Sequence, residues 1–456
     1  MLTHLNLSNF KAWGELDISF GKVTGLFGTN SSGKSSLLQF LLMLKQTKIA
    51  TDRGLALDLG GPDQYVNLGT YKDMVHGHQE SKTISWSLQW TTQKELKIVD
   101  PLRSRKDIFA QGRDLCIESA VKVENKDIAA KYLTYYLGNQ WFSIDPKSEK
   151  NTEFSLSSNS VDNTNEYRFI RTPGRAWAVP GPIKTHLFPD QAKTYYQNAT
   201  FLSEFEIQYE NMMDSIFYLG PLREYPKREY PWAGQSPTDV GKRGERTIGA
   251  ILAATNRNET RNLGWKTHHK EFQEIIAYWL KKLGLIHRFR IEEIAPGSNL
   301  YQAKVRRDSR SPEALLTDVG FGVSQVLPAI VLLYYVPQGS TILMEQPEIH
   351  LHPSVQSGLA EVIMKVAKTR NVQVIVESHS EHLLRRLQRL VAEDFSSASD
   401  VKLYFCDCKN GRSRLEDLNL NVFGEIENWP ENFFGNEIGE LAAIQKASLR
   451  KRMNKN

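Results

Sequence analysis

The octapeptide GTNSSGKS at residues 28–35 constrains the fold of this 456-residue chain more than any other segment. It ends the short apolar run KVTGLFG and leads into KSSLLQFLLMLKQ, whose apolar residues recur at helical spacing. Gly28 and Gly33 allow the backbone to wrap tightly, so that successive N–H groups point inward at the start of a helix. The pattern therefore predicts a strand, a phosphate-binding loop and a helix, in that order.

The polar side chains of this loop suit a nucleotide. Lys34 supplies a cation for the β- and γ-phosphates, and the Ser35 hydroxyl is suited to bind Mg²⁺. The helix N-terminus adds its partial positive charge. The predicted binding residues are Gly28, Thr29, Asn30, Ser31, Ser32, Gly33, Lys34, Ser35 and Ser36.

Two further apolar runs end in polar residues. In ILMEQPEIHLHP (342–353), Glu345 closes the run and can hold Mg²⁺ through water, and in VQVIVESHS (372–380), Ser378 and His379 lie at the tip of the next run. Open parallel sheets bind ligands at the carboxyl ends of their strands. We therefore expect these residues to converge on the phosphate loop, with His379 sensing the γ-phosphate.

The arrangement of apolar runs indicates an α/β fold. Between residues 314 and 407, helices alternate with continuously apolar strands, which is typical of a parallel sheet covered on both faces. We expect this region and the first 75 residues to build one such sheet, with an N-terminal β-rich lobe and a long mixed α/β insertion. The predicted division is 1–78 (N-terminal half of the head), 79–215 (insertion), 216–313 (connecting lobe), 314–407 (C-terminal half of the head) and 408–456 (small C-terminal domain with a basic tail).

Within the insertion the patterns are weaker. TISWSLQW places Ile84, Trp86, Leu88 and Trp90 on one face of a strand. YRFIR (167–171) also reads as a strand, the polar run 148–166 as a loop, and 190–217 as helical. The longest apolar segment, VLPAIVLLYYVP (326–337), is expected to be a buried helix.

Composition excludes several classes of protein. No apolar run approaches the roughly 20 residues that span a bilayer, so we expect no membrane contact. The N-terminus lacks the layout of a secretory signal, and Cys116, Cys406 and Cys408 have neither disulfide nor zinc spacing. We therefore expect a cytoplasmic protein. The net charge of +5 is mild, and the basic tail QKASLRKRMNKN is either a solvated end or a contact for nucleic acid or an acidic partner.

Together these motifs resemble the ABC-type P-loop ATPases of the SMC, RecF and OLD families. GTNSSGKS resembles their Walker A loop, ILMEQPEIHLHP their Walker B segment and VIVESHSEHLL their switch-histidine segment. YLGPLREYP and the ending NVFGEIENWPENFFGNEIGEL resemble a compact bacterial subgroup with a short C-terminal domain of unknown function. The resemblance implies an ABC-type ATPase head that uses ATP and Mg²⁺, with Ser35 and Glu345 as metal ligands and His379 as the switch histidine.

In these families a signature helix precedes Walker B and contacts nucleotide held by the other subunit. TDVGFGVSQVLP (317–328) occupies that place but departs from the usual Leu-Ser-Gly-Gly pattern, with Asp318 where a serine is expected. The resemblance implies a homodimer or higher oligomer in which these residues bind the partner's nucleotide: Gly320, Gly322, Ser324 and Gln325. The alternative is that the segment is only a helix cap.

Gln346 stands where such sites usually carry a catalytic glutamate. It can orient water but cannot accept a proton. Three hypotheses follow: Glu348 or His379 takes the proton and hydrolysis is slow; the chain is an ATP-gated scaffold that rarely hydrolyses; or Glu345 is itself the base and another acid holds the metal. The first hypothesis predicts that Lys34→Ala abolishes turnover.

Several functions are compatible with such an ATPase. It could act as a switch or sensor in phage defence with a separate effector, a nuclease or toxin, or as a DNA-repair ATPase acting on DNA directly. An OLD-type nuclease is disfavoured because the 77 residues after His379 contain no Asp-x-Asp pair, and a transporter subunit because of the long insertion. Arg223 and Arg228 in GPLREYPKREYP are charge stabilisers, partner contacts or salt-bridging residues.

Overall fold

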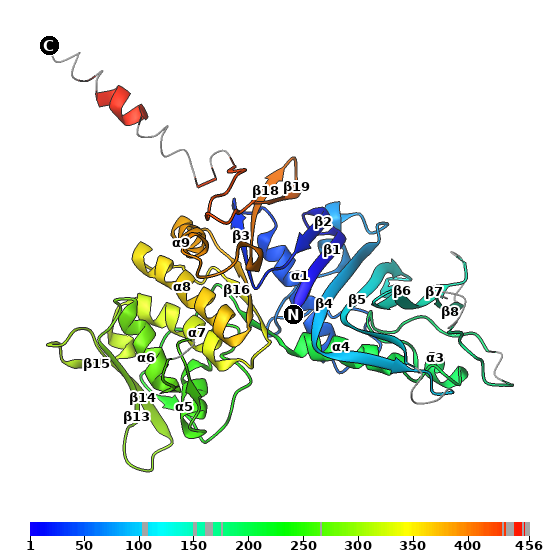
Figure 1. Cartoon of the computed structure of the whole chain (residues 1–456), viewed down its shortest axis with the longest axis horizontal. Helices are drawn as coiled ribbons and strands as arrows, with labels where there is room; N and C mark the ends of the chain where they lie inside the picture. Colours follow the sequence, from blue (N-terminus) through cyan, green and yellow to red (C-terminus); the bar gives the residue numbers. More distant parts are fainter. Residues whose placement is uncertain are drawn as a thin grey trace.

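The computed structural model shows two large sheets joined through a central helix (Figure 1). The residues that the structure describes are 1–102, 108–148, 153–159, 167–174, 177–264, 267–430, 433–434, 442–448 and 451. Most of the basic tail considered above, and much of the polar run 148–166, lie outside them.

The first sheet is antiparallel and lies on the right in Figure 1. In the described residues it has seven strands, in the order β2-β1-β4-β5-β6-β7-β8. The strands are β1 (Leu2–Phe10), β2 (Trp13–Ser19), β4 (Ile84–Val99), β5 (Ile108–Glu124), β6 (Asp127–Leu137), β7 (Gln140–Pro146) and β8 (Phe154–Ser158). Because β4 pairs with β1, the segment after residue 84 extends the sheet that the N-terminus begins.

The second sheet carries the motif segments. Its six described strands have the order β19-β18-β3-β17-β16-β9, all parallel except β19. They are β3 (Val23–Gly28), β9 (Ile216–Leu219), β16 (Thr341–Glu345), β17 (Gln373–Glu377), β18 (Val401–Lys409) and β19 (Arg412–Asp417). The sequence thus correctly predicts a sheet shared by the two ends of the chain, while β9 and β19 were not predicted.

Alternation along the parallel strands divides the interior into two cores. Leu343 and Ile375 face the core that contains α1 and the antiparallel sheet, whereas Met344 and Val376 face the core formed by the C-terminal helices. Strands buried on both faces must be apolar throughout, which accounts for the unbroken apolar runs in the sequence. Helix α1 therefore lies between the two sheets.

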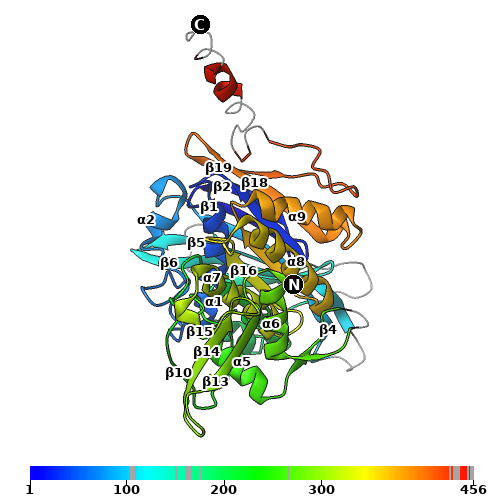
Figure 2. The ribbon, with the colours of Figure 1, turned by 90° about the vertical axis from the view of Figure 1, so that its left-hand side faces the viewer.

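Helices α7, α8 and α9 cover the other face of the parallel sheet, and Figure 2 shows α8 and α9 lying along it. The main helices are α1 (Lys34–Ile49), α3 (Asp190–Tyr195), α4 (Leu202–Asp214), α5 (Thr247–Asn256), α6 (Phe272–Lys282), α7 (Phe321–Tyr335), α8 (Pro353–Arg370) and α9 (Glu381–Ala392). The short helices are α2 (Tyr71–Met74), η1 (His76–His78), η2 (Leu316–Asp318) and η3 (Ala398–Asp400). As predicted, α7 is buried; none of the described helices is long and apolar enough to cross a membrane.

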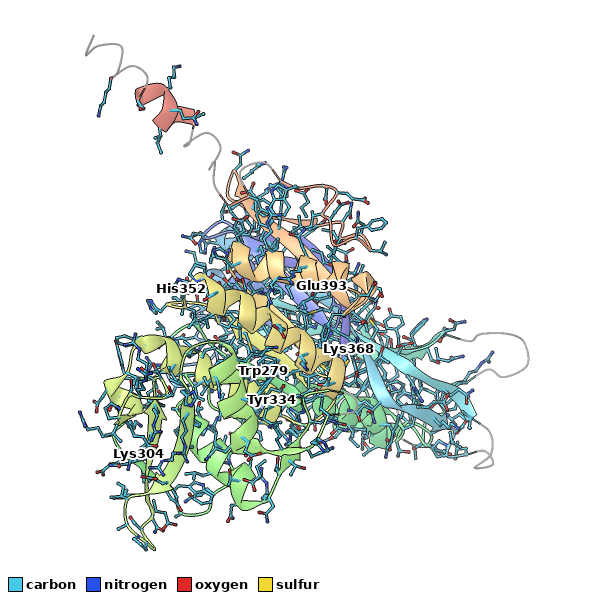
Figure 3. The ribbon with its side chains drawn as sticks, turned by 60° about the vertical axis from the view of Figure 1, so that its left-hand side comes forward. Trp279, Lys304, Tyr334, His352, Lys368 and Glu393 are labelled. Atoms are coloured by element: carbon cyan, nitrogen blue, oxygen red, sulfur yellow. The ribbon has the colours of Figure 1, made fainter. Side chains whose placement is uncertain are left out.

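A smaller sheet completes the lobe on the left of Figure 1. It contains β10 (Tyr230–Pro231), β13 (Arg288–Glu293), β14 (Leu300–Arg306) and β15 (Glu313–Leu315), with the short pair β11 (Thr260–Arg261) and β12 (Lys270–Glu271) nearby in the chain. Figure 3 shows Trp279 of α6 beside Tyr334 of α7, and the indole Nε1 donates a 2.8 Å hydrogen bond to the tyrosine hydroxyl. This contact ties the lobe to the helices that cover the parallel sheet.

Three local predictions were wrong. YRFIR forms no strand beyond an isolated bridge between Arg171 and Tyr196, and the Asn198 amide bonds Ile170 N at 3.0 Å and Arg168 O at 2.8 Å. The polar run after residue 148 is not all loop, because Phe154–Ser158 is the edge strand β8. The predicted helix 190–217 is split into α3 and α4 and ends in β9. In contrast, the face of Ile84, Trp86, Leu88 and Trp90 is buried, as predicted.

One buried amide joins the two sheets. The Gln373 side chain on β17 accepts from Leu2 N at 2.9 Å and donates to Leu2 O at 2.7 Å and to Gly21 O at 2.9 Å. Its oxygen also accepts from the Thr341 hydroxyl at 2.9 Å. A single side chain thus holds β1, β16 and β17 in register.

Replacing this amide should weaken the whole fold. Gln373→Leu leaves the Leu2 and Gly21 backbone groups buried without partners, so we expect the free energy of unfolding to fall by about 2–4 kcal/mol. Urea titration followed by circular dichroism measures this, with the exposed Gln79→Leu as the matched control. A loss no larger than that of the control would show that the sheets are joined by packing alone.

Candidate nucleotide site

The phosphate loop has the backbone geometry that its glycines predict. Gly28 has φ +134°, and a Cβ there would lie 1.9 Å from the Cys406 carbonyl oxygen of the neighbouring strand β18. Gly33 has φ +92°, and its carbonyl accepts a 3.0 Å hydrogen bond from the Trp13 indole. Any side chain at these positions would therefore close the loop or displace its neighbours.

The Lys34 ammonium is folded onto its own loop. It donates to Thr29 O at 2.6 Å, to Gly28 O at 3.1 Å and to the Ser32 hydroxyl at 3.3 Å. Burial lowers the pKa of Lys34, while the nearby Glu377 carboxylate opposes the shift. The cation thus lies within the turn of the loop. The oxygens of an incoming phosphate can replace these carbonyls as its hydrogen-bond acceptors there.

Ser35 contacts an acid that the sequence reasoning missed. Its hydroxyl donates a 2.9 Å hydrogen bond to Glu377 Oε1, at the end of β17 beside β3. The other oxygen, Oε2, is buried and has no hydrogen-bond partner among the described residues. Burial raises the pKa of Glu377, and the Ser35 hydrogen bond lowers it. The acid that closes VQVIVE is the signal that could have identified it.

Glu345 lies one strand further from the loop. It is paired in register with Glu377, and its Oε1 accepts a 2.9 Å hydrogen bond from the Tyr218 hydroxyl of β9. Burial, and then repulsion by Glu377, raises the pKa of Glu345 to about 7. Glu377 therefore lies between Ser35 and Glu345, the two residues that the sequence predicts as metal ligands.

The residues after Glu345 bend back over the strand ends. Gln346 has a left-handed backbone with φ +42°, and its N–H donates to Glu377 O at 2.8 Å. Glu348 is buried and accepts from the Ser378 hydroxyl at 2.6 Å and from His379 N at 2.9 Å. Its Oε2 lacks a partner in the described parts of the chain, and burial raises its pKa. The structure thus brings Glu348 and His379 together, as the sequence predicted for this edge.

His379 is exposed, unlike the two residues before it. Partial burial, and then the Lys34 charge, lowers the pKa of His379. The ring is therefore neutral near pH 7, with a nitrogen available as a donor or acceptor beside the phosphate loop.

Two arginines that the sequence left open have different surroundings. Arg228 is exposed and forms a 3.0 Å ion pair with Asp318. Arg223 is buried at the same strand ends as Glu345 and Glu348, whose charges act on its pKa. Salt bridging therefore explains Arg228 and leaves Arg223 unexplained.

The signature segment begins helix α7. Gly320 precedes its first turn, so the N–H groups there are directed to an open surface beside the exposed Phe321. Ser324 is buried and its hydroxyl donates to Phe321 O at 2.9 Å, while Gln325 is also buried. Four residues were predicted to contact nucleotide held by a second copy of the chain. Of these, the backbone at Gly320 and Gly322 is more accessible to such a ligand than the side chains of Ser324 and Gln325.

His352 has a structural role at the start of α8, where Figure 3 labels it. Its Nδ1 accepts from Ser354 N at 3.3 Å and lies 2.9 Å from the Ser354 hydroxyl, capping the helix. His350 has φ +61° and is exposed in the connecting turn. Both histidines therefore shape the turn between β16 and α8.

The residues present fit a Mg²⁺–nucleotide pair. The glycine positions leave a cradle that a Cβ would fill, and the unpartnered Glu377 oxygen lies beside Ser35. A hydroxyl and carboxylates are the ligand types that Mg²⁺ prefers. Ser35, Glu377 and Glu345 are therefore the groups that would hold the metal.

Comparison with known families agrees with this geometry. The family described as AAA ATPase domain matches residues 1–171 and 251–384, together more than half of the chain. The chain belongs to the AAA ATPase domain family. The prediction of a P-loop ATPase domain is confirmed at the level of this family, and a family described as a protein of unknown function, DUF3696, matches residues 397–444.

Solved structures of SMC heads are similar over most of the ATPase-domain chain. The SMC head bound to the C-winged helix domain of ScpA is 13% identical with a TM-score of 0.46, covering 92% of this chain and 98% of that one. The SMC head domain from Thermotoga maritima is 12% identical with a TM-score of 0.42, covering 92% and 99%. A comparison with curated proteins gives no match.

The burial of Glu345 predicts a pH dependence of stability. The unfolded chain releases this proton near pH 4.3, whereas the folded protein keeps it to about pH 7. The folded state binds more protons in that window, so the contribution of this group to stability is lost as pH rises through it. Without nucleotide or metal, Glu345→Gln should therefore raise the free energy of unfolding at pH 8 by about 1–3 kcal/mol.

Urea unfolding at pH 5 and pH 8 measures this difference, and the exposed Glu80→Gln is the control. Equal stability of Glu345→Gln and the wild type at pH 8 would show that Glu345 is not held in a proton-retaining environment.

Proposed function

We propose that the chain binds ATP with Mg²⁺ on residues 28–36 and hydrolyses it slowly, acting as an ATP-gated switch. The observation that supports this most is the contact between Ser35 of the phosphate loop and the buried acid Glu377, in register with Glu345. A hydroxyl and two carboxylates beside a phosphate cradle are what a P-loop ATPase needs.

In this proposal the loop residues bind and orient the triphosphate. The N–H groups of Gly28 to Ser36 surround the phosphates, and Lys34 exchanges its loop carbonyls for phosphate oxygens. Ser35, with Glu377 and Glu345, would hold Mg²⁺, which would supply positive charge to the phosphates when bound. The strand ends keep these groups buried, where electrostatic interactions are strongest.

In place of a single catalytic glutamate at position 346, Gln346 positions the attacking water and Glu348 accepts its proton. Gln346 orients a water molecule, and its strained backbone fixes the amide next to the strand ends. The water oxygen bonds to the γ-phosphorus, the bond to the bridging oxygen breaks, and its electron pair leaves with ADP. The water proton passes to Glu348, whose raised pKa suits a base, with His379 as the alternative acceptor.

We further propose that ATP joins two copies of the chain. The open N-terminus of α7 at Gly320 and Gly322 would meet nucleotide bound to the second copy, around a two-fold axis. The exposed, mutually packed rings of Tyr225 and Phe321 flank this surface. A slow cycle would then leave the dimer long-lived, as a switch requires.

The setting that we propose is phage defence in the cytoplasm, where such a switch restrains or releases a separate nuclease or toxin. A slow, ATP-gated dimer suits a sensor better than a motor that moves along DNA. ATP turnover with and without DNA tests this choice, since strong stimulation by DNA would favour the repair alternative. A neighbouring effector gene would support the defence role.

Two substitutions separate binding from hydrolysis. Lys34→Ala should abolish ATP binding and turnover, because the loop loses its cation. Glu348→Gln should keep ATP binding and reduce turnover at least tenfold, because the proton acceptor is lost. Phosphate release and nucleotide titration measure both. Unchanged turnover in Glu348→Gln would remove Glu348 from the mechanism, and full activity in Lys34→Ala would refute the proposed site.

ATP should double the mass of the Glu348→Gln variant in light scattering. Adding Gly320→Glu should prevent this, because a carboxylate would face the partner's phosphates. A Cβ at Gly320 meets no described atom within 4 Å, so the monomer accepts the side chain. Gln79→Glu is the control on an exposed turn. An ATP-bound dimer that tolerates Gly320→Glu would exclude α7 from the interface.

A further inference from the structure

Arg223 is turned inward by a fixed turn after β9. Its side chain is 7% exposed, whereas its neighbour Leu222 is 66% exposed. The backbone on both sides is anchored to one segment, with Gly220 N bonded to Lys242 O and Glu224 N to Arg243 O, both at 2.8 Å. The inward direction of Arg223 is therefore built into the turn.

The buried guanidinium has no hydrogen-bond partner. Within the described part of the chain, none of its three nitrogens, Nε, Nη1 and Nη2, finds an acceptor. Arg370 shows the structural alternative, since it is equally buried and donates to Leu333 O at 2.8 Å and Val336 O at 2.7 Å. Burying a charged donor without an acceptor is strongly unfavourable, so a site that keeps one is expected to meet an acceptor during function.

The surroundings of Arg223 explain why it stays charged. Burial lowers the pKa of Arg223 to about 10, while the charges of Tyr218, Glu348 and Glu345 oppose the shift. Neither glutamate is hydrogen-bonded to it: Glu345 Oε1 accepts from Tyr218, Glu348 Oε1 accepts from Ser378 and His379, and Glu348 Oε2 has no partner in the described residues. The guanidinium is thus attracted to the strand ends yet keeps its donors free.

We propose that Arg223 is a catalytic residue that contacts the terminal phosphate of ATP bound to the same chain. The inference rests on the proposed function and adds a second cation opposite Lys34. A guanidinium offers paired donors that match the oxygens of a phosphoryl group. Those oxygens carry the charge that spreads during transfer, and an arginine there accelerates hydrolysis strongly.

This position also gives the site a means of telling ATP from ADP. The loop residues 28–36 hold the phosphates shared by both nucleotides, whereas Arg223 follows β9, which lies on the far side of β16. Only a third phosphate would extend from the loop toward that side.

Nucleotide affinity and thermal unfolding of Arg223→Met test this role. With a non-hydrolysable ATP analogue and Mg²⁺, we expect affinity to fall about 10–100-fold, and affinity for ADP to change less than about threefold. Turnover should fall about 10³-fold. Arg223→Lys should restore part of the affinity but little turnover, because it keeps the charge and loses the fork.

The melting temperature of the nucleotide-free protein distinguishes a catalytic role of Arg223 from a structural one. Arg370→Met should lower the melting temperature clearly and reduce ATP and ADP affinity equally, if at all. Arg223→Met should lower the melting temperature less, because it removes an unsatisfied buried charge. Equal loss of ATP and ADP affinity in Arg223→Met, or wild-type turnover, would overturn the inference. A wild-type chain that binds no ATP would instead refute the proposed function.

Discussion

Three carboxylates and one guanidinium are buried together at the carboxyl edge of the parallel sheet, and the site depends on this arrangement. Burial raises the pKa of all three carboxyl groups, and repulsion by a neighbouring carboxylate adds to the shift at Glu345 and Glu377. The Arg223 charge opposes the shift at Glu345 and Glu348. Such a cluster is unfavourable unless a cation and a phosphate share it. The fold therefore holds in place groups that gain favourable partners when nucleotide binds.

The rest of the architecture keeps these groups in position. Helix α1 holds Ser35 in its first turn and continues into the core between the two sheets, and the Gln373 amide fixes the N-terminal strand against β17. On the other face of the parallel sheet, α7, α8 and α9 bury the strand side chains that point away from α1. Because both faces of the sheet are covered, a ligand can reach it at the polar carboxyl ends of the strands.

The sequence predicted the elements whose signal is local. The glycines and lysine of the phosphate loop, and the apolar runs of β16 and β17, carry enough information to place them. It could not show that β17 lies between β3 and β16, which is why Ser35 meets Glu377 before Glu345. Tyr218 was equally hidden, and the sequence named Arg223 as a candidate without placing it, since β9 reaches the edge from more than a hundred residues earlier in the chain. Short or polar edge strands such as β8 lack the periodicity that identifies buried ones.

A crystal structure of the Glu348→Gln variant with Mg²⁺ and a non-hydrolysable ATP analogue tests the central claim most directly. We predict that the metal replaces the hydrogen bond between Ser35 and Glu377 and that Arg223 lies within hydrogen-bond distance of the γ-phosphate. Nucleotide absent from residues 28–36, or bound there with the Ser35–Glu377 bond intact and the Arg223 guanidinium still unpartnered, would contradict it.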